Sequence, residues 1–171
     1  MLETIRQYAG EQLDKLGESE DVRLRHARWF TILVEQSEPE LEGDQQDEWL
    51  DLLDREHDNI RAALAYAVDA RVDNVALRLA GGSGTFWWIR GYWSEGRRWL
   101  ETALHTSRTD NPALLYKTLE AAAHLAFRQG DDQRARELAV EAVQRAHQLG
   151  DARAIARGLR VLALASLDEG D

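Results

Sequence analysis

Residues 119–131 read LEAAAHLAFRQGD, and residues 159–171, 40 positions later, read LRVLALASLDEGD. Both stretches are apolar runs of helical length that close on Gly-Asp, at Gly130-Asp131 and at Gly170-Asp171. A third, similar run closes on Gly91, which lies 39 positions before Gly130. A repeat of roughly 30 to 45 residues with helical phasing is typical of stacked helical hairpins. The pattern therefore predicts an all-α fold of antiparallel hairpins, an architecture that usually builds binding surfaces.

Helix signals continue outward from this repeat. The chain is rich in Ala, Leu, Arg and Glu, which favour helices, and no alternating run of Val, Ile and Thr predicts a strand. Nine helices are expected: one over 2–16, five that begin at Ser19, after Asp44, at Asp58, at Asp73 and near Trp93, one opened by Asn111-Pro112, and two marked by the apolar residues from Ala135 and from Ile155. The helix that begins at Asp73 is expected to continue to Arg90.

The repeat also predicts where paired helices cross. Small side chains let two helices approach closely, and the 39-residue offset places such residues at matching positions. The expected matches are Gly96 with Ala135, Ala103 with Ala142, and the larger pair Trp99 with Leu138. We expect Trp99 and Leu138 to be equivalent buried residues in successive hairpins.

The net charge of −10 is confined to one segment. Residues 35–58 hold eleven acids and one base, Arg55, so the rest of the chain sums to zero. Because duplex DNA needs Lys and Arg to neutralise its phosphates, we expect no direct nucleic-acid binding by this chain. The acidic segment is interpreted as a solvated face and loop.

The chain contains no cysteine, which excludes disulfides and thiolate zinc sites and is compatible with a reducing, cytoplasmic location. No apolar run approaches ~20 residues, so we expect no membrane-spanning segment and no membrane partner. The two ends also look cut, because no N-cap residue precedes the first helical pattern and no helix follows Gly170-Asp171.

The Gly-Asp-x-x-x-Ala pattern at Gly130 to Ala135 resembles the turn and early second helix of a tetratricopeptide repeat. The period of about 40 is longer than the usual ~34 and is similar to longer-repeat variants in bacterial regulators. This resemblance implies antiparallel hairpins stacked as a tetratricopeptide-like right-handed superhelix.

A second resemblance covers nearly the whole chain. Landmarks in the same order occur after the ATPase core of bacterial STAND-type transcriptional regulators, which include LuxR-family and AfsR-SARP-like proteins. The matching stretches are MLETIRQYA at 1–9, RHARWF at 25–30, WLD at 49–51, EHDNIRAAL at 56–64 and GYWSEGRRWL at 91–100. The sequence has no Gly-x-x-x-x-Gly-Lys-[Ser/Thr] phosphate loop and no recognisable DNA-reading helix, so ATP hydrolysis and DNA binding are not carried over to any residue here.

The resemblance implies a domain organisation and a function. Residues 1–71 are expected to be an N-terminal helical segment that follows a missing ATPase and winged-helix region. Residues 72–171 are expected to be tetratricopeptide-like repeats, truncated at the C-terminus. The implied function is a non-enzymatic sensor that binds a protein or small-molecule inducer, contacts other domains of the same parent chain and controls the ATPase switch. The alternative is a generic tetratricopeptide peptide-binding scaffold without a role in transcription.

The densest aromatic cluster, between Phe86 and Trp99, has two interpretations. Its rings either pack between repeats or form a pocket wall on the concave face. Arg side chains border the cluster and are able to pair with an acidic ligand or peptide. The candidate ligand- or partner-binding residues are Trp88, Tyr92, Arg90, Arg97 and Arg98.

Three other sequence features are weaker candidates for a functional site. The glycines of Gly81-Gly82-Ser83-Gly84 lack the strand and Lys of a phosphate loop, so we expect a bend or a close helix approach there. Glu56-His57-Asp58 cannot converge on one metal ion, because adjacent helical residues diverge by ~100°. His26 and His124 lie on apolar faces and are interpreted as core histidines. We expect no catalytic residue, no metal and no cofactor.

Overall fold

The computed structural model describes residues 12, 15 and 17–167. These residues contain no strand, so the all-α prediction is confirmed for the described part of the chain. The helix expected over 2–16 and the resemblance quoted for 1–9 lie outside it, Gln12 and Lys15 apart. The helices are α2 (Ser19–Glu40), α3 (Gln46–Arg55), α4 (His57–Asp69), α5 (Asp73–Gly82), α6 (Gly84–Arg90), α7 (Trp93–Thr106), α8 (Pro112–Arg128), α9 (Asp132–Leu149) and α10 (Ala152–Leu167).

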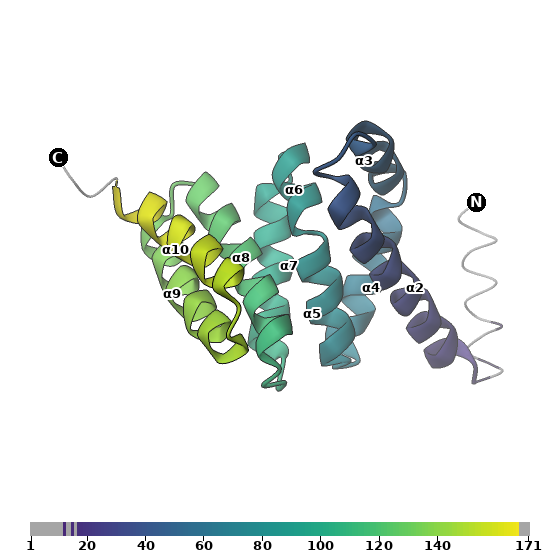
Figure 1. Cartoon of the computed structure of the whole chain (residues 1–171). Coiled ribbons are helices and arrows are strands. Elements are labelled where there is room, and N and C mark those ends of the chain that lie inside the picture. The colour runs from purple at the N-terminus through teal and green to yellow at the C-terminus, as the bar shows by residue number, and fades with distance from the viewer. Residues whose placement is uncertain (1–11, 13–14, 16, 168–171) are drawn as a thin grey trace.

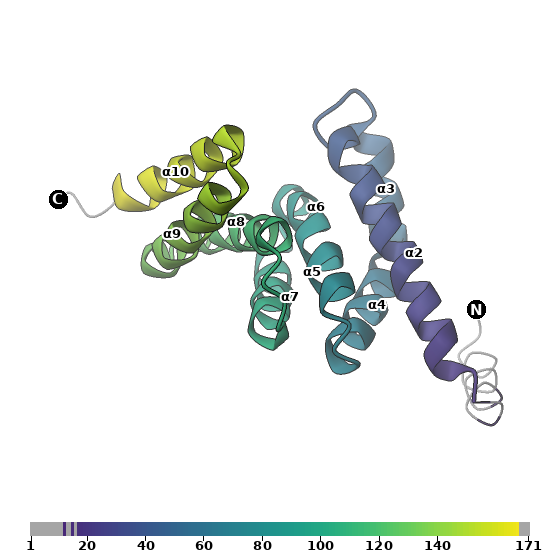
Figure 2. The ribbon, with the colours of Figure 1, turned by 60° about the horizontal axis from the view of Figure 1, so that its bottom comes forward.

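The helices stand side by side in a row from α2 at one side to α10 at the other (Figure 1). A turned view shows the row bent into an arc, with α2 and α3 at one end and α10 at the other (Figure 2). Helix α8 lies between the two halves of the arc. It packs against α5, α6 and α7 of the preceding part and against α9 and α10 of the following part.

The Gly-Asp pair that recurs in the sequence ends one helix and begins the next. Gly130 follows α8 with a φ of 73°, a left-handed conformation that favours glycine. The Asp131 carboxylate then accepts a hydrogen bond from the Arg134 backbone N–H at 3.2 Å and caps α9. At the other end of α8, Asn111 is the N-cap and Pro112 occupies the first turn, as the sequence predicts.

The helix expected from Asp73 to Arg90 is two helices, because Ser83 interrupts it between α5 and α6. Close packing explains the glycines beside the break. A Cβ on Gly82 would lie 2.8 Å from Val34 Cγ2 in α2, and a Cβ on Gly84 would lie 2.7 Å from Ala121 Cβ in α8. Larger side chains would push these helices apart, so the expected close approach is confirmed.

The small residues expected at helix crossings, namely Gly96, Ala103, Ala135 and Ala142, are all buried. The larger pair differs from the prediction in part. Leu138 is 2% exposed, whereas Trp99 is only half-buried. The Trp99 ring packs against the core, and the Arg98 guanidinium lies 5.5 Å from its centroid. The repeat register therefore locates both residues, but the indole also reaches the surface.

Ion pairs join the acidic segment to later helices. Glu35 pairs with Arg78 of α5, and Glu38 pairs with Lys117 of α8, both at 2.5 Å. Part of the segment is thus an internal contact surface and not only the solvated face expected from composition. The division of the chain at residue 71 stays a prediction. None of the described helices combines the length and the apolarity that a membrane crossing requires.

Candidate binding groove

The described residues enclose a groove of about 1040 Å³. Residues of α2, α6, α8 and α10 line it, together with the turns that follow α2 and α9. It is thus assembled from helices that are far apart in the sequence. A concave site with apolar walls and a few convergent polar groups is the usual form of a ligand site.

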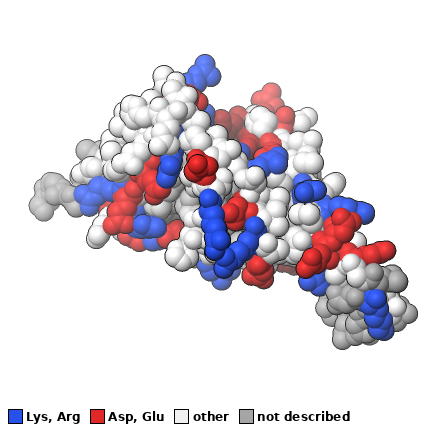
Figure 3. All heavy atoms as spheres, turned by 90° about the horizontal axis from the view of Figure 1, so that it is seen from below, with Lys and Arg blue, Asp and Glu red and all other residues white. Residues whose placement is uncertain are grey.

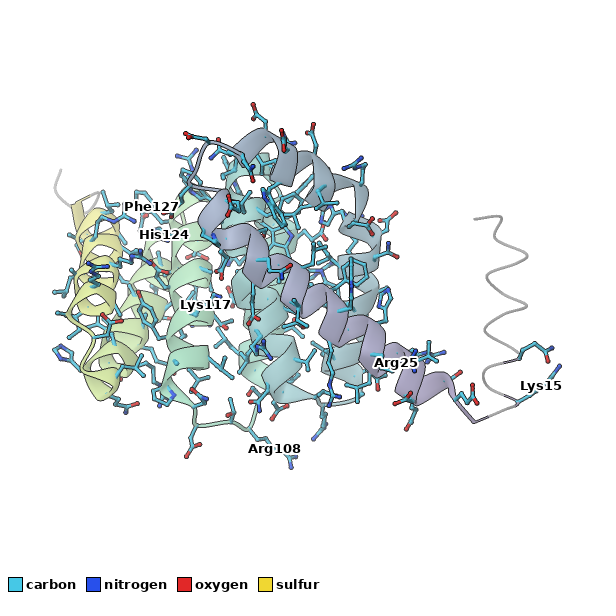
Figure 4. All side chains as sticks on the ribbon, turned by 45° about the vertical axis from the view of Figure 1, so that its right-hand side comes forward. Lys15, Arg25, Arg108, Lys117, His124 and Phe127 are labelled. Carbon is cyan, nitrogen blue, oxygen red and sulfur yellow. The ribbon has the colours of Figure 1, made fainter. Side chains whose placement is uncertain are left out.

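One face of α8 supplies most of the polar groups. Tyr116, Lys117, Glu120 and His124 all line the groove, and their spacing places them on one side of the helix. Figure 4 shows Lys117, His124 and Phe127 in a row along α8. Because Lys117 pairs with Glu38 of α2, its charge is compensated within the chain.

Two arginines of α10 face the groove near this row. Arg160 Nη2 lies 3.3 Å from His124 Nε2, and Arg157 lies about one helical turn earlier. Within the part of the chain that the structure describes, neither arginine forms an ion pair with a carboxylate. The Glu120 carboxyl, which also lines the groove, interacts electrostatically with both arginines and offsets part of their charge, but no described carboxylate forms a direct ion pair with either guanidinium.

Burial shifts the pKa of three groups close to these arginines. Burial, Arg160 and Arg157 lower the pKa of His124 to about 4, so its ring is neutral at pH 7. Burial raises the pKa of the Glu120 carboxyl, while Arg157 and Arg160 act in the opposite direction. Burial and the Glu120 charge raise the pKa of Tyr116 to about 12, and no described residue hydrogen-bonds its hydroxyl. The Tyr116 hydroxyl is thus buried without a hydrogen-bond partner among the described residues.

Trp88 supplies an aromatic wall on the α6 side of the groove. Its side chain is 47% exposed, although its neighbour Trp87 is fully buried. The Trp88 carbonyl accepts a hydrogen bond from Trp93 Nε1 at 3.1 Å, which ties the end of α6 to the start of α7. An exposed indole beside cationic groups is suited to bind a planar or apolar part of a ligand.

The structure places Tyr92 and Arg90 at contacts with α3 and α4. The Tyr92 ring packs against the His57 ring at 4.6 Å, and its hydroxyl donates a hydrogen bond to Asp54 at 3.2 Å. Arg90 pairs with Asp51 at 2.7 Å and with Asp54 at 2.6 Å. Neither residue lines the groove.

Arg97 and Arg98 also lie outside the groove. Arg97 pairs with Glu101 within α7 at 2.7 Å and with Asp131, the N-cap of α9, at 2.5 Å. Arg98 is exposed and lies over the Trp99 ring. Of the five sequence-predicted residues, only Trp88 lines this groove, and a binding role for all five stays a prediction.

His57 of the Glu56-His57-Asp58 motif lies in the packing between α4 and the α6–α7 hairpin. Its ring meets Phe86 edge-on at 5.2 Å, and its Nε2 lies 3.3 Å from Glu95 Oε1. Burial lowers the pKa of His57, although Glu95 raises it. Within the described residues no three His, Asp or Glu side chains gather as a metal site.

The sequence analysis did not identify the polar groove residues of α8 and α10, and it interpreted His124 as a core residue. His124 is half-buried and borders the groove. A signal was present in the 40-residue offset, which aligns Lys117 with Arg157 and Glu120 with Arg160. Long polar side chains that recur inside two otherwise apolar helices indicate a shared exposed face.

Charges of both signs are scattered over the lower face of the molecule, and neither sign forms a continuous field there (Figure 3).

Comparisons with known proteins connect this all-helical, grooved chain to transcriptional regulators. It is 33% identical over 108 residues to two proteins of Mycobacterium tuberculosis and one of Mycobacterium bovis, each named "Putative HTH-type transcriptional regulator". The match covers 63% of this chain and only 12% of each relative. No model of a known protein family matches, and no solved structure matches significantly.

Proposed function

We propose that this chain is a non-enzymatic sensor and protein-interaction segment of a bacterial transcriptional regulator of the STAND type. In this proposal the hairpins stack as a tetratricopeptide-like right-handed superhelix, and the groove binds an inducer or a partner protein. Binding controls the regulator's ATPase switch through other domains of the same parent chain, in the cytoplasm. The similarity to proteins named as HTH-type regulators supports the regulatory context.

The observation that supports the binding site is that Arg157 and Arg160, which form no direct ion pair with a described carboxylate, line a groove that also exposes Trp88. Guanidinium groups bind carboxylates and phosphates strongly because they donate several parallel hydrogen bonds. We therefore propose a ligand with an anionic group for the two arginines and an apolar or planar group for Trp88.

The alternative function is a tetratricopeptide-like peptide-binding scaffold with no role in transcription. The groove extends across four helices, which is enough for an extended peptide, and the similarity to the regulators covers a small share of their length. The two functions share the binding surface and differ in what binding controls.

Reporter transcription under the intact regulator separates these functions. Arg157→Ala with Arg160→Ala should abolish induction, and the matched control Arg153→Ala, an exposed arginine of α10 outside the groove, should preserve it. Trp88→Ala should likewise impair induction, whereas Trp29→Ala, which removes a 55% exposed indole of α2, should not. All four proteins should keep their melting temperature. Reporter transcription that does not depend on the intact protein would favour the scaffold function. Normal induction by the double variant would show that Arg157 and Arg160 are not part of the binding site.

A further inference from the structure

Helix α10 leaves bare a face that α8 keeps buried. In α8, Leu115, Leu119, Ala122 and Ala123 are at most 7% exposed. The 40-residue offset aligns them with Ile155, Leu159, Leu162 and Ala163 of α10. There Leu159 is 48% exposed, Ala163 is exposed, and the other two are half-buried. The same apolar pattern is therefore covered in one helix and open in the next.

The opposite faces of the two helices show that the alignment is structural. Thr118, Ala121 and Leu125 of α8 meet the preceding helices: Thr118 donates a hydrogen bond to the Leu77 carbonyl, and the other two lie against Gly84 and Gly96. Their equivalents in α10 are Gly158, Val161 and Ala165, which are also buried. A Cβ on Gly158 would lie 2.7 Å from Val143 of α9. Both helices thus use one face toward the preceding helices.

The second face of α8 is covered because α9 and α10 follow it and pack against it. Helix α9 contributes a buried face of small and medium side chains, with Ala135, Leu138, Ala139 and Ala142 at most 2% exposed. Helix α10 is the last helix of the row in Figure 1, and no described helix follows it. The second face of α10 is therefore equivalent to the second face of α8, but no described helix covers it.

We propose that this face, formed by Ile155, Leu159, Leu162 and Ala163, docks an amphipathic helix of the α9 type. The occupant carries small and medium apolar residues at the spacing of Ala135, Leu138, Ala139 and Ala142, because those residues cover the equivalent face of α8. The proposal concerns the side of α10 away from its buried face and is independent of the groove. Val161 and Ala165 mark that buried face.

A helix appended to the full chain tests this docking surface. Gly170-Asp171 repeats Gly130-Asp131, so a copy of residues 132–149 is placed directly after Asp171. Hydrogen–deuterium exchange of the α10 amides and the melting temperature are then measured with and without the copy. We expect α10 to exchange about tenfold more slowly with the copy, and the melting temperature to rise, because docking opposes local opening.

Two substitutions make the result specific. Leu138→Asp within the appended copy should remove the protection, and Leu159→Glu in α10 should do the same. In the unextended chain, Leu159→Glu should leave the melting temperature unchanged, since this side chain is 48% exposed. Unchanged exchange with the intact copy, or equal protection by the Leu138→Asp copy, would overturn the proposal. So would a dimer of the unextended chain that Leu159→Glu disperses, because a second copy would then occupy the face.

Discussion

At the scale of single residues, glycine has no side chain and therefore lets neighbouring helices approach closely. Gly96 of α7 lies against the Trp87 ring, and a Cβ on it would approach Trp87 Cδ2 to 2.7 Å and Leu125 Cδ1 to 2.8 Å. Trp87 is fully buried and held on all sides, so the ring has little freedom to move. The position thus requires glycine for space and not for an unusual backbone conformation.

Gly96→Ala should lower the free energy of unfolding by about 1–3 kcal/mol, because overpacking displaces Trp87. Gly43→Ala is the matched control, since the atoms nearest to its new Cβ lie at 3.6 Å, an ordinary contact. Urea unfolding followed by circular dichroism measures both variants. Equal stability of the two would contradict the packing assigned to α6 and α7.

His124 makes stability depend on pH. Its folded pKa of about 4 lies below its usual value, because burial, Arg160 and Arg157 disfavour the charged ring. Between about pH 6.5 and 4 the His124 ring therefore binds a proton in the unfolded chain but not in the folded chain. The free energy of unfolding consequently falls as the pH falls from about 6.5 toward 4.

His124→Gln should flatten this fall, so the difference in unfolding free energy between pH 7 and pH 5 becomes smaller than in the parent chain. Both proteins contain the same other histidines, so the comparison is specific to position 124. An NMR titration of the parent should also give His124 a pKa well below 6. A midpoint near 6.5, or identical pH profiles for the two proteins, would show that the ring is not held as described.

At the scale of elements, turn chemistry and small-residue spacing predicted most of the helices. Asn111-Pro112 and Gly130-Asp131 are local signals, and each begins or ends a helix where the sequence indicates. The glycines at 81, 82 and 84 predicted a bend or a close helix approach, but the residues that they approach, Val34 of α2 and Ala121 of α8, were not predicted because they are distant in sequence. Among the site residues, Trp88 was predicted because aromatic clustering is a local pattern. Arg157 and Arg160 were missed because the groove appears only when α8 and α10 lie together.

The repeat register gives a prediction within one element. In α9, Leu138 is 2% exposed and Val140 is 43% exposed, although both are aliphatic. Leu138→Ala should lower the free energy of unfolding by about 2–5 kcal/mol, because it leaves a cavity between helices. Val140→Ala should change it by less than about 0.5 kcal/mol, as surface substitutions do. Chemical denaturation of the two variants checks the register, and similar losses for both would show that α9 is rotated.

At the scale of the whole molecule, ion pairs join helices that are not consecutive in the chain. Arg61 of α4 pairs with Glu95 of α7, and Arg97 of α7 pairs with Asp131 at the start of α9; each pair is separated by 34 residues. Among the groove residues, the Lys117–Glu38 pair connects α8 to α2. The charges of Arg61 and Arg97 are thus engaged in contacts between helices. Among the described residues, the groove arginines Arg128, Arg157 and Arg160 form no ion pair with a carboxylate, so their guanidinium groups remain for a ligand.

Saturation mutagenesis of residues 18–167 in the intact regulator, scored for both protein abundance and induced transcription, tests the proposed groove most directly. We predict that variants with normal abundance and lost induction concentrate at Trp88, Arg157 and Arg160, which line the groove. Substitutions of Arg97 and Arg98, which lie outside it, should lower induction only where they also lower abundance. The account would be contradicted if the variants that lose induction at normal abundance concentrate at Tyr92, Arg97 and Arg98 while substitutions in the groove leave induction unchanged.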